Sequence, residues 1–111
     1  MEFIIREDRN ICIISAIGHI DASTAEQLEE KFVSKVNDGL NNLVIDLSQV
    51  EFMSSAGLRA ILAGLKETRQ AGGDLRLAAA QPGVEKVLQI SGFTSVIKLY
   101  REINEAVTSF L

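Results

Sequence analysis

The stretch LVIDLSQVEFMSSAGLRAILAGL, residues 43–65, joins an apolar run to an apolar stripe of helical spacing. The run at 43–47 is typical of a short, mostly buried strand. The stripe repeats at i, i+3, i+4 and i+7 and predicts a helix; its members are Leu58, Ile61, Leu62 and Leu65. This helix follows Ser54 and Ser55 and ends at Gly72-Gly73. A strand that leads directly into a helix is the repeating unit of α/β folds with parallel sheets.

Before this unit, two Ile-rich stretches at 3–5 and 11–17 predict two strands, which we expect to form a hairpin. Ser23 stands three positions before Glu26, which is the spacing of a capping box, and predicts the start of a helix. Residues 39–42 are expected to end this helix. Its single apolar stripe consists of Ala25, Leu28, Phe32, Val36 and Leu40.

After the unit, residues 74–78 predict a strand, and a short helix is expected to begin at Pro82 and end at Gly92. Residues 96–99 predict a last strand. A final amphipathic helix follows, with apolar residues Ile103, Ala106, Val107 and Phe110. The alternation predicts an α/β fold in a single domain, residues 1–111, with a mixed, mostly parallel sheet, an N-terminal hairpin and about four helices.

Composition excludes several classes of function. Eleven Lys and Arg against fifteen Asp and Glu give a net charge of −4, which argues against direct binding to nucleic acid. One Cys and one His exclude an internal disulfide and argue against a zinc centre; Cys12, in an apolar strand, is expected in the core. No apolar run approaches the ~20 residues of a membrane span, and the first residues lack a signal-peptide pattern. We therefore expect a cytoplasmic protein without membrane partners.

Small hydroxyl residues gather at two predicted strand-to-helix junctions, residues 18–24 and 52–58. Such junctions lie at the carboxyl ends of parallel strands, where α/β proteins place their sites. Helix capping accounts for one Ser at each junction. Ser54, Ser55 and Gly57 together exceed what one cap needs, and Gly57 suggests that something approaches the backbone closely there.

An enzyme is the weaker interpretation of this junction. A serine hydrolase has G-x-S-x-G around its nucleophile, whereas Met53 stands where the first Gly belongs before Ser55. The only His, His19, precedes the Ser, which reverses the usual order. Neither phosphate-binding glycine motif occurs in the chain. A serine hydrolase therefore remains the third alternative.

Residues 46–58, DLSQVEFMSSAGL, resemble the signature of anti-sigma factor antagonists, the stand-alone bacterial STAS domains, whose pattern is roughly D-[LF]-S-x-[VL]-x-[FY]-[ML]-D-S-[ST]-G-L-G. Residues 18–21 resemble the G-E-[IL]-D element of the family, with His19 at the acidic position. Residues 72–75 resemble G-G-x-L, and Gly92-Phe93 matches the end of [ST]-G-[LF]. The resemblance covers nearly the whole chain in order and spacing.

The resemblance implies that Ser55 accepts phosphate. Ser54 replaces the family's Asp and becomes an alternative acceptor, Ala56 replaces a hydroxyl residue, and Arg59 replaces the final Gly. Arg59 would either pair with the phosphate or belong to a solvated helix face. The residues expected to bind a partner are Asp21, Ser23, Thr24, Ser54, Gly57 and Arg59. Asp21, Ser23 and Thr24 have helix capping as their alternative role, and Asp46 is either a strand end near the acceptor or a turn former.

Partner switching is the function that the resemblance implies. The unphosphorylated chain would bind an anti-sigma factor that is also its serine kinase, and so free the sigma factor. Phosphorylation would end this binding, and a metal-dependent serine phosphatase would restore it. ATP and Mg²⁺ would serve the kinase, so the chain itself would need no cofactor and would not be an enzyme. The alternative is a STAS scaffold, never phosphorylated, within a larger signalling or transport complex.

Overall fold

Five strands form one sheet in chain order, β1-β2-β3-β4-β5, in a computed structural model that describes all residues from 1 to 111. The elements are β1 (Glu2–Asp8), β2 (Ile11–Ile20), α1 (Ala25–Asn37), β3 (Asn42–Met53), α2 (Ser55–Gln70), β4 (Asp74–Ala78), α3 (Pro82–Ile90), a 3₁₀ helix (Phe93–Ser95), β5 (Leu99–Tyr100) and α4 (Ile103–Thr108). β1 and β2 run antiparallel, and the other neighbours run parallel. The predicted mixed, mostly parallel sheet with an N-terminal hairpin is confirmed.

The hairpin turn consists of Arg9 and Asn10, between the paired residues Asp8 and Ile11. Both turn residues have positive φ, 53° and 68°. A two-residue turn with this backbone matches the right-handed twist of the two strands. The turn therefore fixes the register of β1 on β2.

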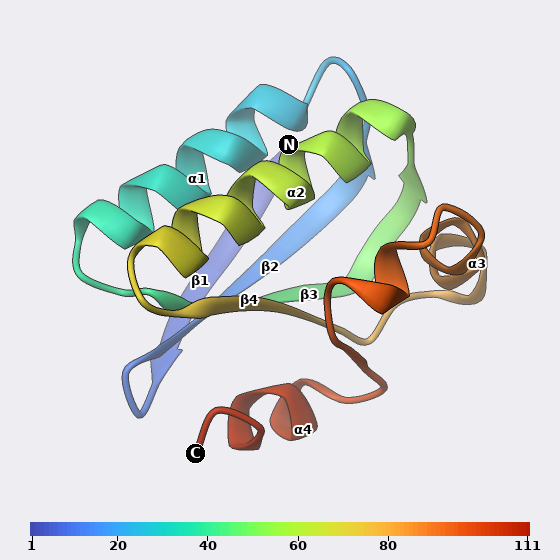
Figure 1. Ribbon diagram of the computed structural model, residues 1–111. Coiled ribbons are helices and arrows are strands. Elements are labelled where there is room, and N and C mark those ends of the chain that lie inside the picture. The colour runs from blue at the N-terminus through green and yellow to red at the C-terminus, as the bar shows by residue number, and fades with distance from the viewer.

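The two faces of the sheet are covered by different helices (Figure 1). α1 and α2 lie side by side on one face, and their apolar sides join the larger core with residues such as Ile14, Leu28 and Ile61. α4 packs on the opposite face and covers a smaller core that includes Ile13 and Val44. The carboxyl ends of β2 and β3, which lead into α1 and α2, remain at the rim of the sheet.

α1 and α2 approach each other closely because α2 has a glycine at the contact. A β-carbon added to Gly64 would lie 2.3 Å from Cδ2 of Phe32, which is buried on α1. Close contact of helices through a glycine lets the aromatic ring fill the space that a larger residue would occupy. The pair therefore sets the distance between the two helices.

The predicted bounds of five elements were wrong. The last strand is residues 99–100 rather than 96–99, because the 3₁₀ helix uses residues up to Ser95 and only Leu99 and Tyr100 pair with β4. The strands predicted at 3–5, 11–17 and 43–47 are longer, since polar residues continue β3 up to Met53. α1 begins at Ala25 rather than at Ser23.

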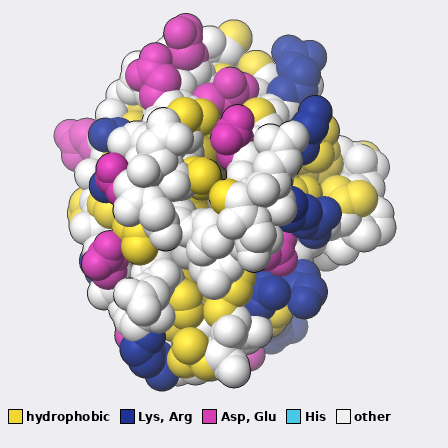
Figure 2. Space-filling model, turned by 60° about the vertical axis from the view of Figure 1, so that its left-hand side comes forward, with side chains coloured by type: hydrophobic (Ala, Val, Ile, Leu, Met, Phe, Trp, Pro, Cys, Tyr) yellow, Lys and Arg dark blue, Asp and Glu magenta, His cyan; other side chains and the backbone are white.

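Charge is unevenly spread over the surface. In Figure 2, acidic side chains are most frequent toward the upper left, and most of the basic side chains lie on the right half, with others at the left and lower left. None of the helices combines the length and the apolar character needed to cross a bilayer.

Candidate functional site

The two hydroxyl-rich junctions meet at the carboxyl ends of β2 and β3. Ile20 pairs with Met53 at the end of this parallel ladder, and the Ser54 amide donates a hydrogen bond of 2.9 Å to the Ile20 carbonyl. The ladder therefore places the segment that follows Ile20 beside the start of α2. The sequence predicted each junction separately, and the pairing of β2 with β3 brings them together.

Ser54 and Ser55 occupy different positions at the start of α2. Ser54 is the N-cap, and its Oγ accepts a hydrogen bond of 3.4 Å from the Gly57 amide. Ser55 is the first helical residue, is exposed, and uses its hydroxyl in no hydrogen bond within the protein. Capping therefore accounts for Ser54 and leaves the Ser55 hydroxyl accessible to another protein.

Gly57 lies beneath the surface, against the end of β2. A β-carbon there would lie 2.7 Å from the Ile20 carbonyl oxygen and 2.8 Å from Ile20 Cγ2. The expected close approach to the Gly57 backbone is confirmed. Because Gly57 is buried, it positions the start of α2, and a direct contact with a partner does not fit its place.

Asp21 organises the turn between β2 and α1. Its Oδ1 accepts hydrogen bonds from the Ser23 amide at 2.9 Å and from Ser23 Oγ at 2.7 Å. Thr24 Oγ1 accepts from the Asp21 amide at 3.0 Å and donates to the His19 carbonyl at 2.7 Å. The hydrogen bonds from Ser23, with smaller contributions from Thr24 and the charge of His19, lower the pKa of Asp21. These contacts therefore favour the ionised form of the carboxylate.

The expected capping of α1 by Ser23 is wrong. Thr24 is the N-cap, its side chain accepts no bond from the helix, and the Ser23–Glu26 capping box does not form. Both hydroxyls are instead engaged in the Asp21 turn. The Asp21 side chain does not cap α1 either. Its carboxylate instead accepts the hydrogen bonds from Ser23 that hold the turn.

An aromatic group beside the junctions escaped the sequence analysis. Phe52 is 51% exposed, although it is a large apolar residue on β3. The His19 ring packs edge-on against Phe52, with centroids 5.9 Å apart. His19 Nε2 lies 3.6 Å from Glu51 Oε2. The sequence offered one signal for this group, namely that Phe52 stands two positions before Ser54. The residues around Phe52 show no apolar alternation that would tell which face of the sheet its side chain lies on.

Asp46 lies in the middle of β3 rather than at a strand end. Its Oδ2 accepts a hydrogen bond of 2.8 Å from Ser15 Oγ, and its Oδ1 accepts one of 2.9 Å from the Ser48 amide. Both Ser15 and Asp46 are buried. Asp46 therefore ties β2 to β3, and the expectation of a strand end near the acceptor is wrong.

Arg59 lies on the exposed side of α2, one turn beyond Ser55. It forms no ion pair, and its guanidinium donates to no group of the protein. No other Lys or Arg occurs in residues 19–26 or 51–59. Arg59 is therefore the single strong cation of the two junctions.

Groups suited to catalysis do not converge at this site. No set of three His, Cys, Asp or Glu is arranged to hold a metal ion. Cys12 is fully buried, as expected, and burial raises the pKa of its thiol. The exposed Ser55 hydroxyl has no side-chain base hydrogen-bonded to it, whereas such a base is what activates a nucleophilic serine.

Comparison with known proteins places this geometry in a family. Residues 2–106 match the family model of the STAS domain, and the chain belongs to the STAS domain family. It is 37% identical over 93 residues to BtrV of Bordetella bronchiseptica, covering 84% of this chain and 80% of BtrV. It is also 31% identical over 104 residues to the anti-sigma-F factor antagonist RsfB of Mycobacterium tuberculosis, covering 94% of this chain and 84% of RsfB.

Solved structures agree with this assignment. The chain is similar to the crystal structure of an anti-sigma factor antagonist from Mycobacterium paratuberculosis, with a TM-score of 0.88, 29% identity and coverage of 97% of this chain and 92% of that chain. SpoIIAA in its unphosphorylated form has the same fold, with a TM-score of 0.83, 22% identity and coverage of 98% and 96% of the two chains. The expected STAS fold is confirmed.

Proposed function

We propose that this chain is an anti-sigma factor antagonist that is switched by phosphorylation of Ser55. The observation that carries the proposal is the exposed Ser55 hydroxyl, free of internal hydrogen bonds, at the first residue of α2. The names of relatives such as RsfB support the same function. The unphosphorylated chain binds an anti-sigma factor and thereby releases the sigma factor.

Phosphate at Ser55 changes the charge of the docking surface without refolding the domain. The added group carries about −1.5 to −2 charges. The first turn of α2 contains no acidic residue, and the free amides and dipole of a helix start favour an anion by roughly 0.3–1 kcal/mol. A partner docked over Ser55 must instead desolvate the new charge, and an uncompensated loss of about 3 kcal/mol weakens binding about a hundredfold.

The anti-sigma factor is also the serine kinase in this proposal, and a metal-dependent serine phosphatase reverses the modification. ATP and Mg²⁺ belong to the kinase reaction, so this chain acts as a regulatory substrate rather than as an enzyme. The exchange takes place in the cytoplasm. Ser55 is the preferred acceptor because Ser54 Oγ is part-buried and occupied by the Gly57 amide.

Phosphorylation mapping tests the proposal. The protein is incubated with each anti-sigma kinase encoded in its genome and ATP, and the modified residue is identified by mass spectrometry. We expect phosphate on Ser55, its loss in Ser55→Ala, and its retention in Ser54→Ala. Modification of Ser54 alone would move the switch to the N-cap, and modification of neither serine by any kinase would reject it.

Binding measurements complete the test. Ser55→Ala is expected to keep the affinity for the anti-sigma factor, and Ser55→Asp to reduce it at least about tenfold. Ser95→Asp is a control that adds the same charge to an exposed serine of the 3₁₀ helix. Equal affinity of Ser55→Asp and Ser95→Asp would contradict the electrostatic mechanism.

A further inference from the structure

We propose that Arg59 is the intramolecular charge partner of phosphorylated Ser55, so that phosphorylation removes the cation of the docking surface as well as adding an anion. The inference rests on the proposed function at Ser55 and specifies how that site is regulated. It starts from the spacing of the two residues on α2. Ser55 is the first residue of the helix, and Arg59 follows four positions later.

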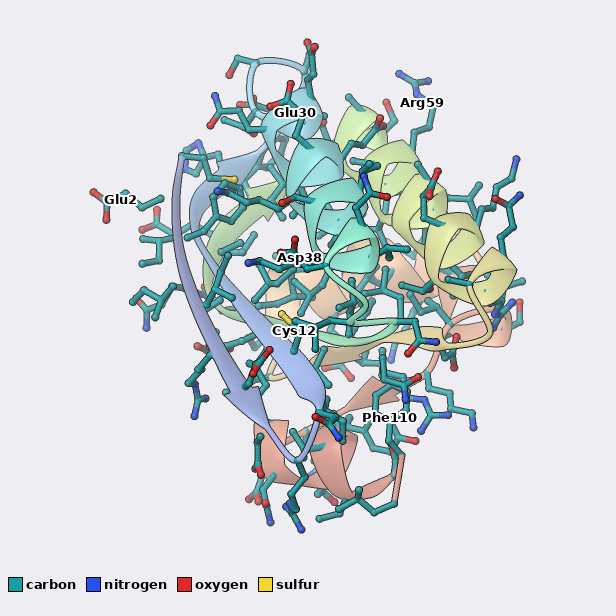
Figure 3. The ribbon with its side chains drawn as sticks, turned by 90° about the vertical axis from the view of Figure 1, so that its left-hand side faces the viewer. Glu2, Cys12, Glu30, Asp38, Arg59 and Phe110 are labelled. Atoms are coloured by element: carbon teal, nitrogen blue, oxygen red, sulfur yellow. The ribbon has the colours of Figure 1, made fainter.

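Helix geometry places Arg59 within reach of Ser55. Residues four apart lie on the same helix face with β-carbons about 5–6 Å apart. Helical side chains also lean toward the N-terminus, which points a long side chain at position 59 back over the turn that holds position 55. Figure 3 shows Arg59 at the N-terminal part of α2, extending away from the body of the protein. An anion N-terminal to a cation at this spacing is the favourable order.

Arg59 is free to make this contact. Arg9 pairs with Asp8, whereas Arg69 and Arg76 both pair with Asp74. Arg59 has no such partner and is exposed. Its guanidinium therefore gives up only water when it turns to a phosphate, and its planar donors match phosphate oxygens in a bidentate arrangement.

The other charges of the junctions are unsuited to neutralise a phosphate. The ionised groups of residues 19–26 and 51–59 other than Arg59 are Asp21, Glu26 and Glu51, all acidic. His19 is the remaining titratable group, and its Nε2 faces Glu51. Within these two segments, a dianion at Ser55 would therefore find one strong cation, Arg59, on its own helix face.

Pairing of Arg59 with the phosphate would also weaken binding of the anti-sigma factor. In the unmodified protein, Arg59 is available to an acidic group of the anti-sigma factor. An intramolecular partner one turn away competes at high effective concentration. Phosphorylation thus withdraws an attractive group and introduces a repulsive one in a single step.

The test uses protein with phosphoserine installed at position 55 during translation, so that no kinase is required. The second pKa of the phosphate is measured by ³¹P NMR in the parent protein, Arg59→Gln, Arg59→Lys and Lys66→Gln. Lys66→Gln removes the same charge from an exposed site on the same helix, 11 residues from Ser55. An adjacent cation favours the dianion, so we expect Arg59→Gln to raise this pKa by about 0.5 unit and Lys66→Gln by less than about 0.1.

Arg59→Lys should recover part of the shift, because lysine keeps the charge and loses the bidentate geometry. The Arg59 Nε–H signal should move when phosphoserine replaces Ser55. Equal phosphate pKa values in Arg59→Gln and Lys66→Gln would overturn the pair. If the phosphate pKa rises in Arg59→Gln but no kinase modifies Ser55, the proposed function is rejected and the pairing of Arg59 with phosphoserine 55 stands. If a kinase modifies Ser55 but the phosphate pKa does not change in Arg59→Gln, the pairing is rejected and the proposed function stands.

Discussion

Gly57 on α2 and Ile20 on β2 are packed so closely that a β-carbon at position 57 would lie 2.7 Å from the Ile20 carbonyl oxygen. The same carbonyl accepts the Ser54 amide. The end of β2 therefore sets both the N-cap and the first turn of the helix that presents Ser55.

Gly57→Ala is expected to destabilise the protein by about 2 kcal/mol or more, because backbone atoms cannot move aside as a flexible side chain can. The free energy of unfolding is measured by urea titration. The substitution should also shift the amide NMR signals of Ser54 and Ser55, because the helix start must move away from Ile20.

Two glycine variants separate this clash from general effects. Gly83→Ala lies on α3 with no atom within 4 Å of the new β-carbon, and it should be neutral or stabilising by up to about 1 kcal/mol. Gly64→Ala meets the Phe32 ring and should destabilise while leaving the Ser55 signals in place. A stability for Gly57→Ala equal to that of Gly83→Ala would disprove the tight packing at Ile20.

The buried pair Ser15–Asp46 is expected to couple β2 to β3. Ser15→Ala leaves the Asp46 carboxylate with one hydrogen bond fewer, which should cost about 1–3 kcal/mol of stability. A double-mutant cycle with Asp46→Ala measures the interaction, and we expect a coupling of about 1 kcal/mol or more. Additive losses in the two single variants would show that the 2.8 Å contact contributes nothing.

Sequence patterns succeeded where the signal is local. The helix that begins at Ser55 was identified because its apolar stripe and its N-terminal serines lie within a few turns of one another. Ser15 and Asp46 are 31 residues apart, and no local rule connects a serine in one strand with an aspartate in another. The pair depends on strand register, which the pattern of either strand alone does not specify.

The start of α1 was misjudged because two local arrangements compete for the same hydroxyls. Ser23 and Glu26 have the spacing of a capping box, but Asp21 stands two residues before Ser23 and takes both its amide and its hydroxyl. A spacing rule counts residues and does not rank these alternatives. The position of the last strand was also predicted wrongly from local composition. It is decided by the backbone pairing of Leu99 and Tyr100 with β4, which a local pattern does not reveal.

Asp21 should titrate below the ordinary aspartate pKa of about 3.9, because Ser23 hydrogen bonds favour its ionised form. The contribution of a lowered pKa to stability is present above the unfolded-state value and is lost as the pH falls through the folded-state value. Carbon-detected NMR gives the pKa of this carboxyl directly. Ser23→Ala should raise it toward 3.9, and an unchanged value would contradict the hydrogen-bonded turn.

Phe52 is expected to be an anchor for the anti-sigma factor, because it presents a large apolar ring, 51% exposed, two residues before Ser54. Aromatic residues are enriched at the centres of protein interfaces, where the few anchor residues each cost about 2 kcal/mol or more when they are truncated to alanine. Phe52→Ala should therefore weaken binding by about tenfold or more and change the free energy of unfolding by less than about 1 kcal/mol. Leu111→Ala is the matched control, since Leu111 is 66% exposed and the C-terminus lies at the far end of the molecule from the β2–α1 turn (Figure 1). An affinity of Phe52→Ala no different from that of Leu111→Ala would confine the docking surface to the polar junction.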